Sequence, residues 1–461
     1  MQCDDRSDSG TNDDQLRSAV DAALAANPRD GGAWSTLGLL LRRTGRLDGA
    51  IACHRRGLEF APGNASIWSN LGNALTEAGR LEEGVAAQTE ALRLDPGNPT
   101  VLHNGVVALR KAGHFREALG LIDQAITRLT PELRWERALA RLQVGDYVHG
   151  FTDYEARREL SAFHGRKPSR PAWDGGPLEG RTILLSTEQG FGDALLMARY
   201  VPLVKARGGR VLYECHPELR RVLSGLEVDG FVPPGAPVPA FDVEASQMSL
   251  PGLFGTTLAS VPPPARLTIP PEAREKAARL LGARESGTLR VGIVWSGRVT
   301  FADNGRRATS LARFLRFAEV PGVRLYSLQK GPPEAELADL GPAARLLTPL
   351  GPDLDDFADT AAVLEQLDLV IMTDSAVAHL AGSLGTPVWN LVQHVPYWIY
   401  GCSGPHTPWY PTMRLFRQGS DLDWGPVFAA AADALRDEVR GRSQLEDGPV
   451  ADSSQRSHRP R

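Results

Sequence analysis

The chain has 461 residues, of which 42% are hydrophobic and 23% charged. These values are ordinary for globular proteins, and the length is enough for about two to four domains, so a chain that is disordered or fibrous over most of its length is excluded. The formal net charge is −4, and no basic block forms the electrostatic footprint of a nucleic-acid-binding protein.

The cysteines and the N-terminus indicate a reducing compartment. No pair of cysteines has CxxC or metal-ligand spacing, so we expect free thiols at Cys3, Cys53, Cys215 and Cys402. The acidic start, MQCDDRSDSGTNDDQ, is unlike a secretory signal. No apolar run approaches the roughly 20 residues of a membrane span. We therefore predict a cytoplasmic protein without a membrane span.

A period of 34 residues organises the N-terminal third. The residues that repeat at this interval are Pro28, Pro62 and Pro96, Trp34 and Trp68, Leu37 and Leu71, Gly38 and Gly72, and Gly45 and Gly79. A 34-residue period with W-x2-L-G and a closing proline is the signature of the tetratricopeptide repeat (TPR). Each such helix pair leaves an apolar face that a neighbouring pair must cover.

We predict TPR repeats over 15–160, with units at about 31–64, 65–98 and 99–131 and a degenerate capping pair after them. Residues 15–28 supply the second helix of an incomplete first unit, and residues 1–14 are predicted to be a disordered tail. The usual use of such an array is a concave groove that binds a peptide. The alternative is a helical bundle without a binding role.

From about residue 160 the pattern changes to short β-branched runs that alternate with helical stretches. Residues 161–178 are rich in Pro, Gly and Arg and are predicted to be a linker. Strands are expected at 181–186, 210–215, 289–295, 323–329, 367–373 and 387–392, with helices between them, including 193–206 and 217–225. Alternation of this kind predicts two Rossmann-like halves with parallel sheets, at 179–270 and 286–438, and a disordered tail over 441–461.

The sequence EQGFGD (188–193) follows the first strand of this region. It lacks the GxGxxG pattern of a nicotinamide-binding unit, but Gly190 and Gly192 allow a tight turn and leave room for an acceptor. Asp193 then opens the next helix. It either stabilises the helix start or acts as a general base toward an attacking hydroxyl, and the sequence leaves both open.

The segment DSAVAHLAG follows the strand LDLVIMT. Ser375 is a natural N-cap after Asp374, so the N–H groups of the next residues would point into a cleft and bind a phosphate or pyrophosphate. Helical side chains lean toward the N-terminus, so His379 could reach the same anion. A lone histidine at such a position is more often structural, which is the alternative.

Two more loops end strands of the same half. WSG (295–297) leads into Arg306 and Arg307, and LQKG (328–331) contains Lys330. Cations that face a cleft suit a diphosphate leaving group, and solvated surface charge is the alternative. DLDD (353–356) precedes an apparent helix start, so capping explains it better than metal binding, and we predict no metal site.

Taken together, EQGFGDALLMARYVPLV, VWSG with a downstream arginine, SLQKG, DTAAVLEQLDLVIMTDSAVAHLAGSLGTPVW and PWYPTMRLFRQ resemble bacterial TPR-linked glycosyltransferases. The catalytic part of these proteins is similar to the ADP-heptose:lipopolysaccharide heptosyltransferases. The resemblance covers about residues 15–436. It implies a GT-B fold and an inverting, metal-independent transfer from a nucleotide-diphosphate sugar, which is a co-substrate, so no cofactor is expected.

The resemblance also implies roles for single residues. Asp193 matches the family's proposed base, beside the acceptor-side glycines Gly190 and Gly192. Contacts to the donor sugar and its diphosphate match Asp374, Ser375, Ala376, Val377 and His379. Ser296, Gly297 and a nearby cation match the other wall of the donor site, to which we assign Arg307, Gln329 and Lys330.

The chain departs from the family pattern at two places. Relatives show an Arg-Ser pair after the WSG loop where this chain has Arg307-Ala308, which loosens the assignment of that cation. Many relatives show a DWRW cluster where this chain has PYWIY (396–400). In the implied fold that segment lies near the cleft mouth, so the choice of acceptor or donor is open.

The predicted function is a glycosyltransferase whose TPR repeats hold a protein or glycan acceptor or a partner. The first alternative is a TPR scaffold with a degenerate GT-B module. The presence of Asp193, Asp374 and His379 argues against decay of the site. The second alternative is a dinucleotide enzyme, against which the missing GxGxxG argues.

Overall fold

The structure is a computed structural model that describes residues 6–125, 129–163, 165–301 and 304–446. The chain divides into two compact units. Unit 1 comprises Met1–Phe163 together with Tyr397–Cys402, and unit 2 comprises His164–Pro396 together with Ser403–Arg461. The chain therefore leaves unit 2 after Pro396, contributes a short segment to unit 1 and returns.

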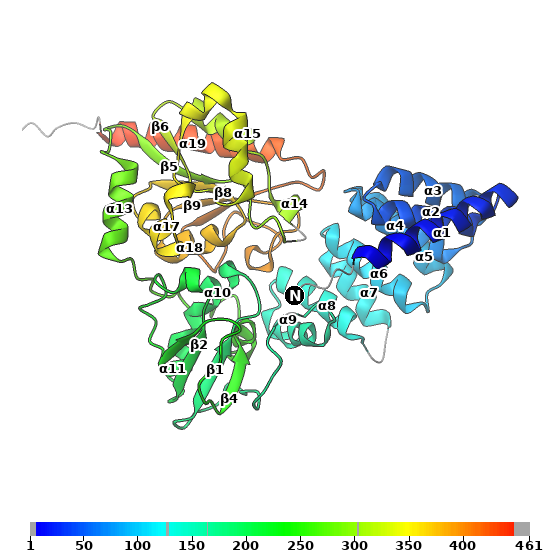
Figure 1. The fold of residues 1–461 in the computed structure, drawn as a ribbon, viewed down its shortest axis with the longest axis horizontal. Coiled ribbons are helices and arrows are strands. Elements are labelled where there is room, and N and C mark those ends of the chain that lie inside the picture. Colours follow the sequence, from blue (N-terminus) through cyan, green and yellow to red (C-terminus); the bar gives the residue numbers. More distant parts are fainter. Residues whose placement is uncertain (1–5, 126–128, 164, 302–303, 447–461) are drawn as a thin grey trace, which may run out of the picture. The chain divides into compact units, whose positions relative to one another are not determined.

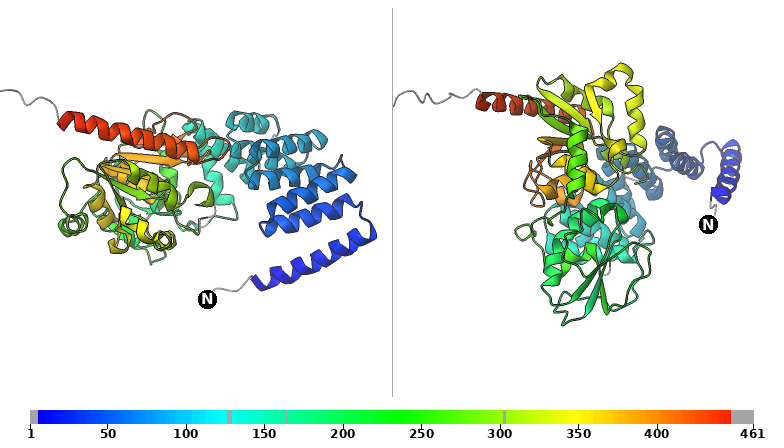
Figure 2. Two further views of the ribbon diagram at one scale, coloured as in Figure 1. Left: turned by 90° about the horizontal axis from the view of Figure 1, so that it is seen from above. Right: turned by 60° about the vertical axis from the view of Figure 1, so that its left-hand side comes forward.

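Unit 1 consists of helices that stack as antiparallel pairs (Figure 2). Its elements are α1 (Arg6–Ala26), α2 (Gly31–Arg43), α3 (Leu47–Phe60), α4 (Ala65–Glu77), α5 (Leu81–Leu94), α6 (Pro99–Lys111), α7 (Phe115–Ala125), α8 (Pro131–Gln143), α9 (Tyr147–Tyr154) and the 3-10 turn Glu155–Glu159. The pairs α2–α3, α4–α5 and α6–α7 fall in the three predicted repeat units. The prediction of helical repeats is confirmed.

The 34-residue period also fixes where the helices begin and turn. Asp30, Asn64 and Asn98 are N-caps whose side chains accept backbone N–H groups of the following turn, which satisfies donors that the helix leaves unpaired. Gly45 and Gly79 have φ values of 73° and 78°, in the left-handed region that glycine enters without strain. Residues of the repeat itself therefore specify where each helix pair begins and where it turns.

The helices at both ends of the chain extend into the predicted tails. Residues 6–14 belong to α1, so the tail predicted over 1–14 is corrected there, and α19 (Gly425–Glu446) continues into the tail predicted over 441–461. Extending a formed helix adds a hydrogen bond for each residue fixed, whereas starting a new helix is costly. The remaining residues of both predicted tails lie outside the described residues.

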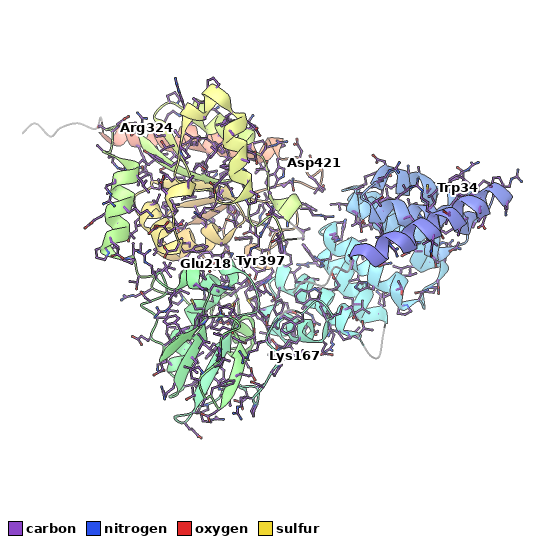
Figure 3. The ribbon with its side chains drawn as sticks, viewed as in Figure 1. Trp34, Lys167, Glu218, Arg324, Tyr397 and Asp421 are labelled. Atoms are coloured by element: carbon purple, nitrogen blue, oxygen red, sulfur yellow. The ribbon has the colours of Figure 1, made fainter. Side chains whose placement is uncertain are left out.

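An aromatic cluster forms at α8 and α9. The ring of Trp398 meets those of Tyr147 and Phe151 edge-on, with centroids 5.8 and 5.4 Å apart, and Trp398 is only 3% exposed. Edge-to-face aromatic pairs are favourable. The segment that contains Trp398 and its neighbour Tyr397 (Figure 3) thus packs within the helical unit, and the place of PYWIY relative to a cleft stays a prediction.

Unit 2 contains two sheets in which all strand pairs are parallel. The first has the order β3-β2-β1-β4 and the second β10-β9-β8-β5-β6-β7. Their strands are β1 (Thr182–Ser186), β2 (Arg210–Glu214), β3 (Gly230–Val232), β4 (Val243–Ser246), β5 (Leu289–Val294), β6 (Val323–Ser327), β7 (Leu347–Pro349), β8 (Leu369–Thr373), β9 (Val388–Val392) and β10 (Met413–Arg417).

Helices lie on both faces of the larger sheet (Figure 1). Those of unit 2 are α10 (Phe191–Met197), α11 (Val201–Lys205), α12 (Leu250–Leu253), α13 (Pro271–Leu281), α14 (Asn304–Arg307), α15 (Leu311–Phe314), α16 (Glu336–Asp339), α17 (Phe357–Leu364), α18 (Ala376–Leu384) and α19. Two Rossmann-like halves after a helical repeat region are what the sequence predicts, and this fold class is confirmed.

Three local predictions differ from the structure. The helix expected over 193–206 is divided into α10, a 3-10 turn and α11, with Pro202 in the first turn of α11. The helix expected over 217–225 is only the 3-10 turn Pro217–Leu219. Part of the predicted linker over 161–178 packs against the first sheet of unit 2. Trp173 is buried and donates its backbone N–H to the carbonyl of Glu244 in β4.

None of the helices in the described ranges combines the length and the apolar composition that crossing a membrane requires.

Candidate functional site

The candidate residues follow the central strands of both sheets. Strand β5 lies between β8 and β6, and β1 lies between β2 and β4, so each is a point where successive connections run to opposite sides. In parallel α/β sheets, ligands bind at such points beyond the carboxyl ends of the strands. The candidates come after β1, β5, β6 and β8.

At the end of β8, Asp374 leads into Ser375, which is the N-cap of α18. The Ser375 side chain accepts the N–H of Val377 at 3.3 Å, and the helix ends at Gly385, whose φ is 77°. The predicted cap is therefore confirmed. The first turn of this nine-residue helix presents backbone N–H groups and the positive end of its dipole, an arrangement that favours anions.

Arg307 lies beside this helix start. Its Nη1 is 3.5 Å from Oδ2 of Asp374, and both side chains are mostly buried. Gly297 makes room for the guanidinium, because a Cβ on Gly297 would lie 2.7 Å from Nη2 of Arg307. Asn304 donates to the hydroxyl of Ser296 at 3.1 Å. The WSG loop and Arg307 are thus brought together with Asp374, whereas Arg306 is exposed.

Gln329 is buried and joins the ends of β5 and β6. Its Oε1 accepts the N–H groups of Trp295 and Ser296 at 3.1 and 3.0 Å, and its Nε2 donates to the carbonyls of Ser296 and Lys330. Because both ends of the amide are bonded to backbone, Gln329 holds the Ser296 loop in place. A direct contact of Gln329 with the donor stays a prediction.

The ammonium group of Lys330 donates to the carbonyls of Gly351, at 2.8 Å, and Leu354. It thereby fixes the loop that precedes α17. Lys330 is assigned to the diphosphate because it is a cation at the end of a strand. In the structure its ammonium group donates hydrogen bonds to backbone oxygens. Its contact with the donor also stays a prediction.

In the first half of unit 2, Gly190 is the N-cap of α10 and Asp193 lies in its first turn. The side chain of Asp193 is half-buried. Gly192 is close to the other half, because a Cβ on Gly192 would lie 2.8 Å from Cδ2 and 3.2 Å from Nε2 of His379. The expectation that Gly192 leaves room for an acceptor is therefore corrected, since the ring of His379 occupies that space.

His379 is 4% exposed, and its Nδ1 lies 3.1 Å from the hydroxyl of Tyr410. Burial lowers the pKa of His379 to about 4, and the charges of Arg199 and Arg307 act in the same direction, against Asp374. The imidazole is therefore neutral at pH 7. Any contact it makes with an anion is a hydrogen bond from a neutral ring.

Sequence reasoning missed Arg199 and the pair Trp409 and Tyr410. Arg199 follows α10, is buried, and donates to the carbonyls of Trp409 and Pro262, each at 3.1 Å. Its guanidinium lies 5.0 Å from the ring centroids of both aromatic residues. The signal was the PWYP motif, but nothing local links it to an arginine 210 residues away.

The acidic run 353–356 is explained by helix capping, as predicted. Asp356 is the N-cap of α17, and its side chain accepts the N–H groups of Ala358 and Asp359. Across the part of the chain that the structure describes, no group of three or more His, Cys, Asp or Glu residues is placed to hold a metal ion.

Comparison with known proteins gives one match to the repeat region and another to a longer part of the chain. A tetratricopeptide-repeat family model matches residues 17–65 and 54–99. Protein FlbA of Caulobacter vibrioides (strain ATCC 19089 / CIP 103742 / CB 15) is 28% identical in an alignment of 331 residues, and the match covers 66% of this chain and 55% of that protein. This chain thus spans about half the length of the curated relative that it matches.

Two solved structures of glycosyltransferases are similar to part of the chain. The glycosyl transferase family 9 structure from Veillonella parvula DSM 2008 is matched over 58% of this chain and 100% of its own, with 13% identity and a TM-score of 0.43. The ADP-heptose lps heptosyltransferase II of E. coli is matched over 56% of this chain and 99% of its own, with 12% identity and a TM-score of 0.40.

Proposed function

We propose that this chain is a glycosyltransferase that moves a sugar from a nucleotide-diphosphate sugar to a hydroxyl group of a protein or glycan acceptor. The observation that carries the proposal is the close approach of Gly192 to His379, which sets the start of α10 beside the start of α18. The candidate base Asp193 therefore lies near the candidate donor contacts Asp374 and Ser375, although these residues belong to different halves of unit 2.

In the proposed reaction, the α18 start and Arg307 receive the diphosphate, since helix N–H groups and a guanidinium both suit phosphate oxygens. Asp193 accepts the proton of the acceptor hydroxyl. The acceptor oxygen bonds to the anomeric carbon while the bond from that carbon to the diphosphate breaks, and the nucleoside diphosphate leaves with the electron pair. A single displacement inverts the anomeric configuration. Arg307 and the helix amides balance the leaving charge, so neither a metal ion nor a cofactor is assigned.

The TPR repeats of unit 1 are proposed to hold the acceptor or a partner protein. The match of the repeat family to residues 17–99 supports a role in protein interaction, because stacked helix pairs form extended concave surfaces. The free thiols of Cys53, Cys215 and Cys402 support a reducing location, for which the cytoplasm is proposed.

The donor is tested by calorimetry of the full chain with ADP-, GDP-, UDP- and CDP-sugars. A charge-assisted contact contributes about 1.5–3 kcal/mol, so Asp374→Asn should weaken binding of the accepted donor by about tenfold to a hundredfold. Asp421→Asn, which changes an exposed carboxylate of unit 2 (Figure 3), is the control and should leave the affinity unchanged.

The catalytic step is tested with Asp193→Asn. General-base catalysis supplies about 10²–10⁴-fold, so turnover should fall by that factor while donor affinity stays within a few-fold. Asparagine stabilises a helix start nearly as well as aspartate, so transfer at the parent rate would assign Asp193 to the helix alone. A folded parent chain that binds none of the four donor classes would favour the scaffold alternative.

A further inference from the structure

A buried arginine joins the two halves of unit 2. Arg199 lies in the 3-10 turn Ala198–Tyr200, which directly follows α10 in the first half, and it is only 3% exposed. Its Nε donates to the carbonyl of Leu196 in α10, at 2.9 Å. One end of the guanidinium is thereby fixed to the helix whose first turn carries Asp193.

The other end of the guanidinium bonds outside the first half. Nη1 and Nη2 both donate to the carbonyl of Trp409, each at 3.1 Å, and Trp409 lies between β9 and β10 of the six-stranded sheet. Nη1 also donates to the carbonyl of Pro262 at 3.1 Å, in the segment between α12 and α13 that connects the two sheets. One side chain therefore bonds to both halves and to the segment between them.

The guanidinium is surrounded by carbonyl oxygens and aromatic rings. Its carbon lies 5.0 Å from the ring centroids of both Trp409 and Tyr410, a distance at which an aromatic face attracts a cation. Such neighbours replace only part of the hydration that a buried charge loses, so an apolar side chain would fill the same space at a lower cost in free energy. What arginine adds is direction, because its planar fork of N–H groups bonds to acceptors at fixed positions.

The segment that Arg199 holds in the second half packs against α18. The hydroxyl of Tyr410 lies 3.1 Å from Nδ1 of His379, and its ring lies so close to Gly382 that a Cβ there would be 2.6 Å from two ring carbons. His379 and Gly382 both belong to α18, whose start is the candidate donor site. A continuous series of contacts thus runs from α10 through Arg199 and Tyr410 to α18.

This series is a second connection between the two helices, because a Cβ on Gly192 at the start of α10 would lie 2.8 Å from Cδ2 of His379. Connections at both ends of a short helix fix its direction, whereas a single one would let it pivot. We propose that Arg199 is a positioning residue that holds α10, and with it the candidate base Asp193, against the donor site of the second half. This rests on the proposed function, because Asp193 has a reaction to serve only if the chain transfers a sugar.

The first test measures the distance between the halves without any ligand. Spin labels replace two exposed residues, Glu218 of the first half and Asp421 of the second (Figure 3), through a ketone-bearing amino acid that spares the native thiols. Double electron–electron resonance of the full chain then gives the distribution of the distance. Arg199→Met fills a similar volume without donors and should broaden or lengthen this distribution. An unchanged distribution in the folded variant would overturn the proposal.

Two further variants separate this role from damage to the fold. Arg181→Met is the matched control, because Arg181 also donates to carbonyls, but to those of Pro177 and Leu178 just before β1; it should leave the distribution unchanged, and an equal broadening would overturn the proposal. Arg199→Lys keeps the charge but not the fork that bonds to Trp409, so the distribution should lie between those of the parent and Arg199→Met. If Arg199→Met does not fold, a parent-like distribution in Arg199→Lys would overturn the proposal instead.

The second test separates positioning from binding, with whichever nucleotide sugar the parent transfers. The proposed donor contacts all belong to the second half, so Arg199→Met should keep donor affinity within a few-fold. A misplacement of about 1 Å can cost about a hundredfold in rate, so turnover should fall by about tenfold to a hundredfold. Turnover at the parent rate, or a loss of donor affinity as large as the loss of turnover, would overturn the positioning role. If the parent transfers no sugar, the proposed function fails, and the first test still decides whether Arg199 holds the halves together.

Discussion

Each unit contains a buried histidine that lies against a glycine, and the two pairs do different things. In unit 1, a Cβ on Gly38 would lie 2.6–2.8 Å from ring atoms of His54, and in unit 2 a Cβ on Gly192 would lie 2.8 Å from His379. Burial lowers the pKa of both histidines to about 4. The local physics is therefore the same, and the difference lies in what each pair joins.

The pair in unit 1 joins two consecutive helices, α2 and α3, of one repeat. His54 bonds to the hydroxyl of Ser35 at 3.2 Å, while its Nε2 is buried with no hydrogen-bond partner among the described residues. One period later, Gln88 lies against Gly72 in the same way. Glutamine can thus replace histidine in this position, which identifies the role as packing.

The pair in unit 2 joins helices that follow strands of two different sheets, α10 and α18. Here Nδ1 of the histidine lies 3.1 Å from the hydroxyl of Tyr410, and the neighbours of the pair are the charged residues Asp193 and Asp374. A buried histidine beside charged groups at strand ends is typical of a functional site, whereas one inside a helix pair is part of a core. The predictions below test this contrast.

The largest effect is expected from removing a tryptophan. Trp295 directly follows β5, is fully buried, and donates from its indole to Glu336 at 2.9 Å. Trp295→Ala should cost unit 2 about 3–5 kcal/mol, and Trp68→Ala should cost unit 1 less, because its indole is half-exposed. Denaturant unfolding followed by circular dichroism measures both.

Stacked repeats lose stability locally, so Trp68→Ala should leave donor affinity intact, whereas Trp295→Ala should abolish it. Loss of donor binding in Trp68→Ala would show that the units unfold together.

Acid should destabilise both units through the two histidines. Their folded pKa of about 4 lies below the usual value of about 6.5, so the unfolded chain binds more protons between these values. Stability is therefore fully present above pH 6.5 and falls as the pH drops toward 4, by about 3 kcal/mol for each histidine. Urea unfolding at stepwise pH measures the slope.

The matched control uses the chain's own repeat. His54→Gln copies Gln88 of the next unit and should remove much of the acid sensitivity of unit 1 while leaving that of unit 2. An unchanged slope in His54→Gln would assign the acid sensitivity to other groups, such as the carboxylates.

Filling the glycine positions should separate stability from activity. Overpacking costs about 1–3 kcal/mol, so Gly38→Ala should lower the stability of unit 1 by this amount, reduced by the better helix propensity of alanine. Gly192→Ala should displace the ring of His379 and weaken donor binding severalfold. Calorimetry and thermal unfolding of both variants check this, and equal effects on donor affinity would contradict the contrast.

The smallest effect is expected at Arg221. Its guanidinium joins Asp356 and Asp359 of the α17 start, at 3.0 and 3.2 Å, to Glu272 of α13. The side chain is 39% exposed, and exposed ion pairs contribute about 0–1 kcal/mol. Arg221→Gln should therefore lower the stability of unit 2 by less than about 1 kcal/mol at low salt, and raising the salt concentration should shrink the difference.

Much of the fold could be predicted because the deciding interactions are short in sequence. The 34-residue period contains its own caps at Asn64 and Asn98 and its own turning glycines, so each helix pair is specified locally. The β-branched runs predicted the central strands of both sheets. The edge strands β3, β4, β7 and β10 were not predicted. Two of them, β3 and β7, have three residues each, which is too few to show a periodicity.

The candidate site was predictable only in part. Ser375 could be identified as a cap because its partner, the N–H of Val377, is two residues away. The contacts of Lys330 could not be predicted in this way, because the carbonyls to which it donates, those of Gly351 and Leu354, are 21 and 24 residues away in the sequence. A cation's partner depends on which loops pack beside it, and the sequence does not contain that information in local form.

By itself, then, the sequence determined the repeats, the alternation of the central strands with helices, and the residues that end those strands, because backbone hydrogen bonding and side-chain periodicity act over a few residues. Only the tertiary structure decided that Gly192 meets His379, that Arg199 bonds to the carbonyl of Trp409, and that Trp398 packs among the aromatic rings of α9. These contacts join segments that are far apart in the chain. Which residues meet depends on side-chain shape and burial, and these are defined only once the chain has packed.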